Sequence, residues 1–384
     1  MNNIPFNKPY LSGNETDYIR NAVLSGKISG DGYYTKKCTE FFESKMGFNK
    51  VLLTTSCTDA LEMAAILLDI KDGDEVIAPS YTFVSTVNAF VLRGAKIVFV
   101  DSNSNNPNIN ADDIEALITP RTKVIIPVHY AGIACDMDKI MELAKKYNLF
   151  VVEDAAQAID SSYKGRPLGS IGHLAAFSFH ETKNIISGEG GMLVINDERF
   201  IKRSEIIREK GTNRSSFFRG EVDKYGWVDI GSSFLPSDII AAFLFAQLEN
   251  IEDIQKKRKQ IWAIYNEKLE KLKNQGIKLP YISSDATNNA HMYYLVCRNI
   301  EERTELIDYL KERKVHAVFH YLSLHKSTFY SSKHDERILK YSDFYSDCLI
   351  RLPMYYEMTD EETSIISEYI IDFYNNKRNS SINE

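Results

Sequence analysis

Short apolar runs alternate with amphipathic stretches through the first half of the chain. The runs VLLTT, EVIAP, KIVFVD, KVIIPV and LFVVED begin at residues 51, 75, 96, 123 and 149. Helix-length segments separate them, such as MDKIMELAKKYN at residues 137–148. Near-continuous apolar strands that alternate with helices are typical of a parallel sheet covered on both faces. We therefore predict an α/β fold with a mostly parallel sheet between about residues 51 and 195.

The pattern changes after residue 246. A long charged segment, residues 247–274, is predicted to be a helix that bridges to a second unit. Beyond it, the segments MYYLVCRN, EERTELIDYLKERK and HAVFHY predict a small α+β unit, which a helix over residues 360–374 closes. The sequence thus predicts a large domain over residues 1–250 and a small domain over residues 251–384.

Composition excludes several classes of protein. The net charge of −7 argues against nucleic acid as the main ligand. No apolar run approaches the roughly 18 residues of a membrane helix, and the N-terminus lacks the features of a secretory signal. The five cysteines include no C-x-x-C pair, which indicates neither a disulfide framework nor a zinc site. We expect a soluble cytoplasmic enzyme without a metal.

One lysine stands out by its position. Lys183 lies between an apolar strand at residues 175–179 and a glycine-rich turn, GEGG. Ligands bind at the carboxyl ends of the strands in open α/β sheets, so a lysine here is suited to capture a carbonyl group as a Schiff base. Asp154 ends another apolar strand, where a carboxylate is suited to pair with a pyridinium nitrogen. By itself Asp154 fits a capping role better, but together the two residues favour a pyridoxal-phosphate enzyme.

Two further segments follow strand ends. Ser56, Cys57 and Thr58 begin the helix after VLLTT, where free backbone amides favour a phosphate. Serine and threonine also cap helices for purely structural reasons, which makes this signal weak by itself. Phe83 follows the next strand, where an aromatic ring is placed either to stack on a planar cofactor or to pack in the core.

Candidate substrate contacts fall in the segments FHYLSLH and REKGTNR. None of the histidines has the spacing of a metal site, which leaves FHYLSLH as a candidate for the wall of a polar substrate pocket. The charged and polar residues of REKGTNR are candidates for binding a diphosphate. Ordinary structural roles, or a solvated helix end, fit the two segments equally well. The residues concerned are His320, Tyr321, His325, Lys210, Asn213 and Arg214.

The motifs SCTDALE, PSYTFVST, VVEDAAQ, FSFHETKN and GEGG, in this order, resemble the DegT/DnrJ/EryC1/StrS family of sugar-nucleotide aminotransferases. The similarity extends over nearly the whole chain. It implies the type I aspartate aminotransferase-like fold and pyridoxal 5′-phosphate as cofactor. It also implies that Lys183 forms the Schiff base and shuttles a proton, that Asp154 holds the pyridine nitrogen, and that Gln157 lies near the ring hydroxyl. The remaining implied cofactor contacts are Phe83 on the ring and Ser56, Cys57, Thr58 and Ser178 on the phosphate.

Within the family, REKGTNRSSFFRG, DIGSSFLPSD and VFHYLSLH resemble the enzymes that make dTDP-4-amino-4,6-dideoxygalactose. This implies that glutamate donates an amino group to C4 of dTDP-4-dehydro-6-deoxyglucose, for O-antigen, enterobacterial common antigen or a related surface polysaccharide. The glucose epimer and another nucleotide ketosugar stay open as alternatives. Lys183 argues against the dehydratases of this fold, in which histidine replaces the lysine.

The resemblance also implies a homodimer whose active sites lie at the subunit interface. Many relatives carry an asparagine just before the helix that is predicted here to begin at Pro236, and this asparagine reaches the partner subunit's cofactor phosphate. Phe234 and Leu235 occupy that region in this chain, so the amide is missing. Ser232 and Ser233 are the candidate replacements.

Overall fold

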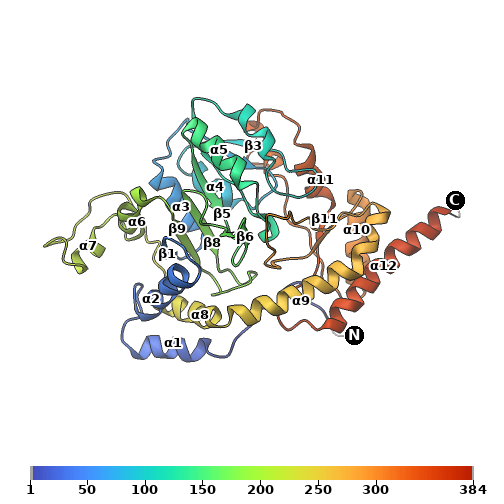
Figure 1. Ribbon diagram of the computed structural model, residues 1–384, viewed down its shortest axis with the longest axis horizontal. Coiled ribbons are helices and arrows are strands. Elements are labelled where there is room, and N and C mark those ends of the chain that lie inside the picture. The colour runs from blue at the N-terminus through green and yellow to red at the C-terminus, as the bar shows by residue number, and fades with distance from the viewer. Residues whose placement is uncertain (1–2, 383–384) are drawn as a thin grey trace.

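A seven-stranded sheet forms the centre of the protein (Figure 1). Its strand order is β1-β9-β8-β5-β4-β2-β3. The computed structural model describes residues 3–382. Neighbouring strands pair in parallel from β8 to β3, whereas β9 pairs antiparallel with both β8 and β1. The predicted mostly parallel sheet is therefore confirmed. The strands are β1 (Lys50–Thr54), β2 (Glu75–Pro79), β3 (Lys96–Val100), β4 (Thr122–Ile125), β5 (Phe150–Asp154), β8 (Leu174–Ser178) and β9 (Gly191–Ile195).

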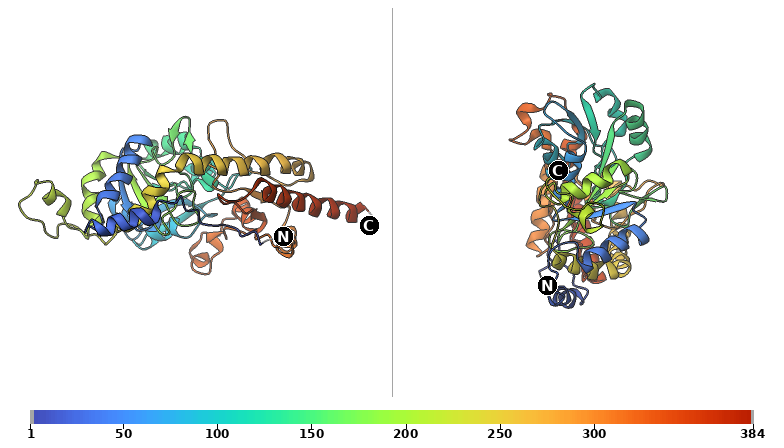
Figure 2. Two further views of the ribbon diagram at one scale, coloured as in Figure 1. Left: turned by 90° about the horizontal axis from the view of Figure 1, so that it is seen from below. Right: turned by 90° about the vertical axis from the view of Figure 1, so that its left-hand side faces the viewer.

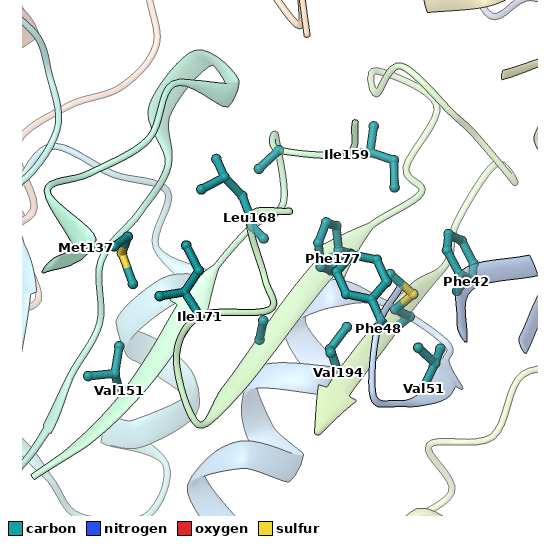
Figure 3. Packing of buried hydrophobic residues seen from close by; sticks show 14 of the residues in the cluster. Phe42, Phe48, Val51, Met137, Val151, Ile159, Leu168, Ile171, Phe177 and Val194 are labelled. Carbon is teal, nitrogen blue, oxygen red and sulfur yellow. The ribbon is translucent and has the colours of Figure 1, made fainter. Parts of the chain in front are cut away.

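Alternate strand residues point to opposite faces of this sheet, and each face has its own core. On one face Val51, Phe177 and Val194 pack together with Phe42 and Phe48 (Figure 3). The ring centroids of Phe48 and Phe177 lie 5.3 Å apart. The helices that cover this face are α2 (Tyr33–Glu40), α5 (Met137–Tyr147) and α8 (Asp238–Glu249).

The opposite face carries Leu52, Ala176 and Leu193. Its helices are α3 (Cys57–Leu67), α4 (Ser85–Val91) and α6 (Ile201–Arg208). Because α3 follows β1 and α4 follows β2, both helices begin at the carboxyl edge of the sheet. Ligands bind at this edge in folds of this kind.

A further core, here called the C-terminal core, lies in the C-terminal part of the chain. Its helices pack against a two-stranded antiparallel sheet, and α9 and α12 lie side by side (Figure 2). Ile4 is buried in the same core and pairs with Val315, so the N-terminal segment packs against the C-terminal part of the chain. The elements are α9 (Ile251–Leu269), α10 (Ile300–Glu312), α11 (Lys340–Cys348), α12 (Asp360–Ile382), β10 (Tyr294–Val296) and β11 (Leu349–Arg351).

Two predicted helix boundaries need correction. The helix expected over residues 247–274 is divided at Asn250 into α8 and α9 and ends in a 3-10 turn, and the final helix continues past Tyr374. Within residues 3–382, no helix combines the length and the apolar character needed to cross a membrane. The remaining elements are α1 (Glu15–Leu24), α7 (Arg214–Phe218), β6 (Ser162–Tyr163), β7 (Arg166–Pro167), the π-helix η1 (Phe41–Lys45) and the 3-10 turns η2 (Ala111–Asp113), η3 (Glu115–Leu117), η4 (Tyr130–Gly132), η5 (Glu198–Phe200), η6 (Glu270–Gln275), η7 (Leu324–Lys326) and η8 (Ser331–Lys333).

Candidate active site

A cavity of about 610 Å³ opens at the carboxyl edge of the sheet. Segments of the large sheet and of the C-terminal core both contribute to its wall. All the residues predicted to bind the cofactor line it, together with two of the predicted substrate contacts. These residues are Ser56, Cys57, Thr58, Phe83, Asp154, Gln157, Ser178, Lys183, His320 and Tyr321.

Lys183 lies in the turn between β8 and β9. The neck of this turn is closed by a backbone hydrogen bond of 2.8 Å from Phe179 to Gly190. Burial lowers the pKa of Lys183 to about 8, and the positive charge of Arg351 acts in the same direction. An amine with this pKa is partly unprotonated near neutral pH, and so it is suited to attack a carbonyl carbon.

Asp154 is the last residue of β5 and is buried. Its Oδ2 accepts a hydrogen bond of 2.7 Å from Thr86 Oγ1, and its Oδ1 accepts one of 3.2 Å from the backbone of Ala156. Burial nevertheless raises the pKa of Asp154. A cation in the cavity would offset the cost of burying the negative charge of Asp154, so the site fits the protonated nitrogen of a pyridine ring.

Thr86 was not among the predicted residues. It is buried, and its hydroxyl also hydrogen bonds with Thr82 Oγ1 at 2.9 Å. It follows Phe83 by three positions, and its backbone amide donates a hydrogen bond of 3.2 Å to the carbonyl oxygen of Phe83, which forms a turn at the start of α4. This spacing is the sequence signal that places Thr86 beside the cavity.

The start of α3 forms a cradle for an anion. The hydroxyl of Ser56 caps the helix, and Thr58 Oγ1 donates to Ser85 Oγ at 2.9 Å. Gly191 passes so close that a Cβ atom there would lie 2.3 Å from the carbonyl carbon of Ser56 and 2.4 Å from the amide nitrogen of Cys57. Only glycine fits between β9 and the helix. The free amides and the dipole of α3 fit a phosphate group.

Gln157 and Phe83 complete the predicted cofactor wall. The side chain of Gln157 accepts a hydrogen bond of 2.6 Å from the backbone of Ala131 and donates one of 3.3 Å to the Tyr321 hydroxyl. Phe83 is 54% exposed, and its ring centroid lies 5.7 Å from that of Tyr321. An uncovered aromatic ring on a cavity wall is suited to stack on a planar cofactor.

Other residues on the wall come from distant parts of the chain and were not predicted. Arg351 ends β11, and its Nη1 lies 3.2 Å from His320 Nδ1. Phe6 also lines the cavity, and next to it Asn7 Nδ2 donates to the carbonyl oxygen of Glu181 at 3.1 Å. Neither Arg351 nor Phe6 belongs to a local motif, so the sequence carries no signal for them.

His325 does not line the cavity. It is buried, with its Nδ1 2.7 Å from Ser80 Oγ and its Nε2 3.5 Å from Asp343. It lies within the 3-10 turn η7, and its ring contacts Ser80 and Asp343 and not the cavity wall. Within this protomer His325 therefore has a packing role.

The segment with Lys210, Asn213 and Arg214 also lies outside the cavity of this protomer. Asn213 Oδ1 accepts a hydrogen bond of 2.8 Å from the backbone of Gly226. The guanidinium of Arg214 lies 5.1 Å from the ring centroid of Phe218. Helix α7 lies at the end of the molecule remote from the C-terminal core (Figure 1).

The region of the missing asparagine has a clear local structure. Phe234 is buried in the core, and its carbonyl oxygen accepts a hydrogen bond of 3.0 Å from the backbone of Thr55. Ser232 and Ser233 are exposed. Phe234 therefore serves packing, and the two serines are the groups that face away from this protomer's core.

Residues 9–370 match the DegT/DnrJ/EryC1/StrS aminotransferase family. This chain belongs to that family. It is 33% identical over 378 residues to GDP-perosamine synthase of Escherichia coli O157:H7, with 98% of this chain and 100% of that protein covered. It is 32% identical over 384 residues to the spore coat polysaccharide biosynthesis protein SpsC of Bacillus subtilis, with 96% of each covered.

Solved structures agree with this assignment. The PLP form of the putative sugar aminotransferase Spr1654 from Streptococcus pneumoniae superposes with a TM-score of 0.88 at 27% identity, covering 98% of this chain and 99% of that one. The predicted family, fold class and enzyme class are thus confirmed. This sugar aminotransferase uses pyridoxal 5′-phosphate, and the geometry around Lys183, Asp154 and Gly191 fits that cofactor.

Proposed function

We propose that this aminotransferase moves the amino group of glutamate to C4 of dTDP-4-dehydro-6-deoxyglucose and forms dTDP-4-amino-4,6-dideoxygalactose for a surface polysaccharide. The observation that supports amino transfer is the pairing of a partly unprotonated Lys183 with the buried Asp154 on one cavity. The likeness of REKGTNRSSFFRG and VFHYLSLH to enzymes of that specificity supports the choice of sugar nucleotide.

A second candidate acceptor is a GDP-linked ketosugar. It is favoured by the relative named GDP-perosamine synthase, which matches this chain over nearly its full length. The two candidates share the same chemistry at the reacting carbon. The two candidates differ in the nucleotide and in the substituents of the sugar ring.

The cofactor, when bound, supplies an electron sink for the charge that develops on the reacting carbon. Lys183 would hold the cofactor covalently, and its Nζ would carry the proton to and from the substrate carbon. Asp154, oriented by Thr86, would keep the ring nitrogen protonated. Both half-reactions use the same proton carrier, so one central lysine suffices.

We infer that the enzyme is a homodimer with a cavity near each interface. Two side chains in the segment between α6 and α8 are strongly exposed although they are apolar: Trp227 at 83% and Phe218, the last residue of α7, at 69%. Exposed apolar side chains that gather in one segment are typical of interaction surfaces. The same segment carries the predicted diphosphate contacts, Lys210, Asn213 and Arg214, which we assign to the partner's cavity. Ser232 and Ser233 are then placed to replace the missing amide.

Product analysis tests the proposed reaction. The enzyme is incubated with glutamate and dTDP-4-dehydro-6-deoxyglucose, and the configuration at C4 of the product is determined by NMR. An axial amine supports the galactose product, whereas an equatorial amine identifies the glucose epimer. Turnover only with the GDP-linked ketosugar would establish the second candidate and reject the first.

A substitution at the central lysine tests the chemistry itself. Purified wild-type enzyme should show the visible absorption of the lysine-bound cofactor. Lys183→Ala should lose both this band and the activity. An unchanged band or full activity in that variant would contradict the assignment of Lys183.

A further inference from the structure

Arg351 is a buried cation without an acidic partner. It is 7% exposed, and none of the ion pairs within residues 3–382 includes it. Its Nε atom is buried and has no hydrogen-bond partner. Burial of a guanidinium without a counter-charge is unfavourable. An anionic ligand beside Arg351 would remove this cost.

The surroundings hold Arg351 in one place. Its guanidinium lies 5.1 Å from the ring centroid of Phe6, and its Nη1 lies 3.2 Å from His320 Nδ1. The backbone of His320 is fixed in turn, because its carbonyl oxygen accepts hydrogen bonds from Tyr81 at 2.5 Å and from Tyr130 at 2.9 Å. Arg351 is thus positioned before a ligand arrives, which lowers the entropic cost of binding.

The contact with His320 also fixes the state of that ring. A guanidinium only donates hydrogen bonds, so His320 Nδ1 must be the unprotonated acceptor. Burial, together with the charge of Arg351, lowers the pKa of His320 to about 4. His320 therefore stays neutral at physiological pH. It supports the guanidinium without adding a second positive charge that would change the selectivity for anions.

Arg351 lines the same cavity as Lys183 and lies close enough to lower the pKa of that lysine. In an amino-acid donor, the carboxylate is bonded to the carbon that carries the reacting amine. In a sugar nucleotide, the diphosphate is attached at C1, across the ring from C4. A cation beside the central lysine therefore meets the donor's α-carboxylate more readily than the acceptor's diphosphate.

We propose that Arg351 binds the α-carboxylate of the amino-acid donor, and that Phe6 and His320 hold its guanidinium in position. The inference deepens the proposed function, because it rests on glutamate as the donor. The planar fork of the guanidinium matches a carboxylate with two parallel hydrogen bonds. Arg351 then acts mainly in the half-reaction that loads the amino group and contributes little to the half-reaction with the sugar.

Binding of a non-reactive dicarboxylate is the first test. Glutarate lacks an amino group and cannot react, so its affinity for the holoenzyme reports the carboxylate site alone and is measured by calorimetry. Arg351→Gln should weaken glutarate binding roughly 30-fold, since it removes a charge-assisted pair. Arg351→Lys keeps the charge but loses the fork, and should weaken it about fivefold. Arg199→Gln, a surface arginine paired with Asp197, is the matched control and should leave the affinity unchanged.

Single-turnover kinetics separate the two half-reactions. For Arg351→Gln, the glutamate concentration at half-maximal rate should rise roughly 30-fold. The reaction of the amino-loaded enzyme with the ketosugar should change less than about threefold. Thermal unfolding establishes that each variant is folded, and Arg351→Lys serves if the glutamine variant is not.

The outcomes discriminate between the inference and the proposed function. Unchanged glutarate affinity and glutamate dependence in Arg351→Gln would overturn the inference. A defect confined to the sugar half-reaction would also overturn it, and would assign Arg351 to the diphosphate. If the wild-type enzyme reacts with glutamate but not with the dTDP sugar, the proposed acceptor fails, and the glutamate defect of Arg351→Gln still supports the inference. If the wild type does not react with glutamate, the proposed donor and the inference both fail.

Discussion

A methyl group at Gly191 should damage the phosphate cradle while leaving the rest of the site intact. In Gly191→Ala, the new Cβ would lie 2.3 Å from the carbonyl carbon of Ser56 and 2.4 Å from the amide nitrogen of Cys57. Both are backbone atoms and cannot rotate away. Gly191 pairs with Thr54 on one side and with Ser178 on the other, so β9 cannot move sideways within the sheet. The start of α3 must therefore move outward.

The size of this movement sets the expected effect. An ordinary carbon–carbon contact is about 3.5 Å, so the helix start must shift by about 1 Å. A shift of that size breaks hydrogen bonds from the backbone amides to a phosphate. Loss of one or two charge-assisted bonds costs about 2–4 kcal/mol, which corresponds to roughly 30- to 1,000-fold weaker cofactor binding. Overpacking should also lower the free energy of unfolding by about 1–3 kcal/mol.

Reconstitution measures the loss directly. The cofactor-free protein is titrated with pyridoxal 5′-phosphate, and the visible absorption of the lysine-bound form gives the apparent affinity. Gly47→Ala is the control, because a Cβ there meets no atom within 4 Å and the residue does not line the cavity, while its φ of +76° costs some stability as Gly191→Ala does. If Gly191→Ala binds the cofactor as tightly as Gly47→Ala does, the close approach of β9 to α3 does not shape the phosphate site, and the reasoning is refuted.

Three further outcomes are expected. Thr86→Val removes the hydrogen bond to Asp154 and should weaken cofactor binding roughly tenfold, whereas Thr86→Ser retains the hydroxyl and should bind the cofactor normally. Equal cofactor affinities of the two variants in a titration would contradict the role of the Thr86 hydroxyl. Asp238→Ala leaves the two backbone amides at the start of α2 without their acceptor, so the free energy of unfolding measured with denaturant should fall by about 2–3 kcal/mol. An unchanged free energy of unfolding would contradict this. In the cofactor-free enzyme only the unprotonated Lys183 captures the cofactor. The capture rate measured by stopped flow should therefore rise with pH and level off above about pH 8. A rate that still rises towards pH 10 would exclude the lowered pKa.

The sequence predicts the part of the site that lies next to strand ends. Apolar runs locate the parallel strands, and Asp154 and Lys183 follow directly from the ends of β5 and β8. Short-range information suffices there, because a parallel sheet brings all its carboxyl ends to one edge. The antiparallel β9 is also consistent with its sequence, since the loop that joins it to β8, residues 179–190, contains no crossover helix.

Residues that reach the cavity from the C-terminal core could not be found in this way. Arg351 is adjacent to Lys183 only because β11 pairs with β10 and the C-terminal core packs onto the sheet. The single sequence offers no pattern that links positions so far apart. His325 shows that a short distance along the chain from His320 does not bring two side chains to one cavity, because His325 lies within η7 and contacts Ser80 and Asp343.

The start of the chain has a practical consequence for work with this enzyme. Ile4 is fixed in the C-terminal core, and Phe6 forms part of the cavity wall. A tag or fusion partner joined ahead of Ile4 would therefore be attached only a few residues before a segment of the cavity wall. Helix α12 runs away from the sheet at the other end of the chain (Figure 2). Immobilisation or labelling through α12 should therefore leave catalysis undisturbed, and the C-terminal side is the place for a handle.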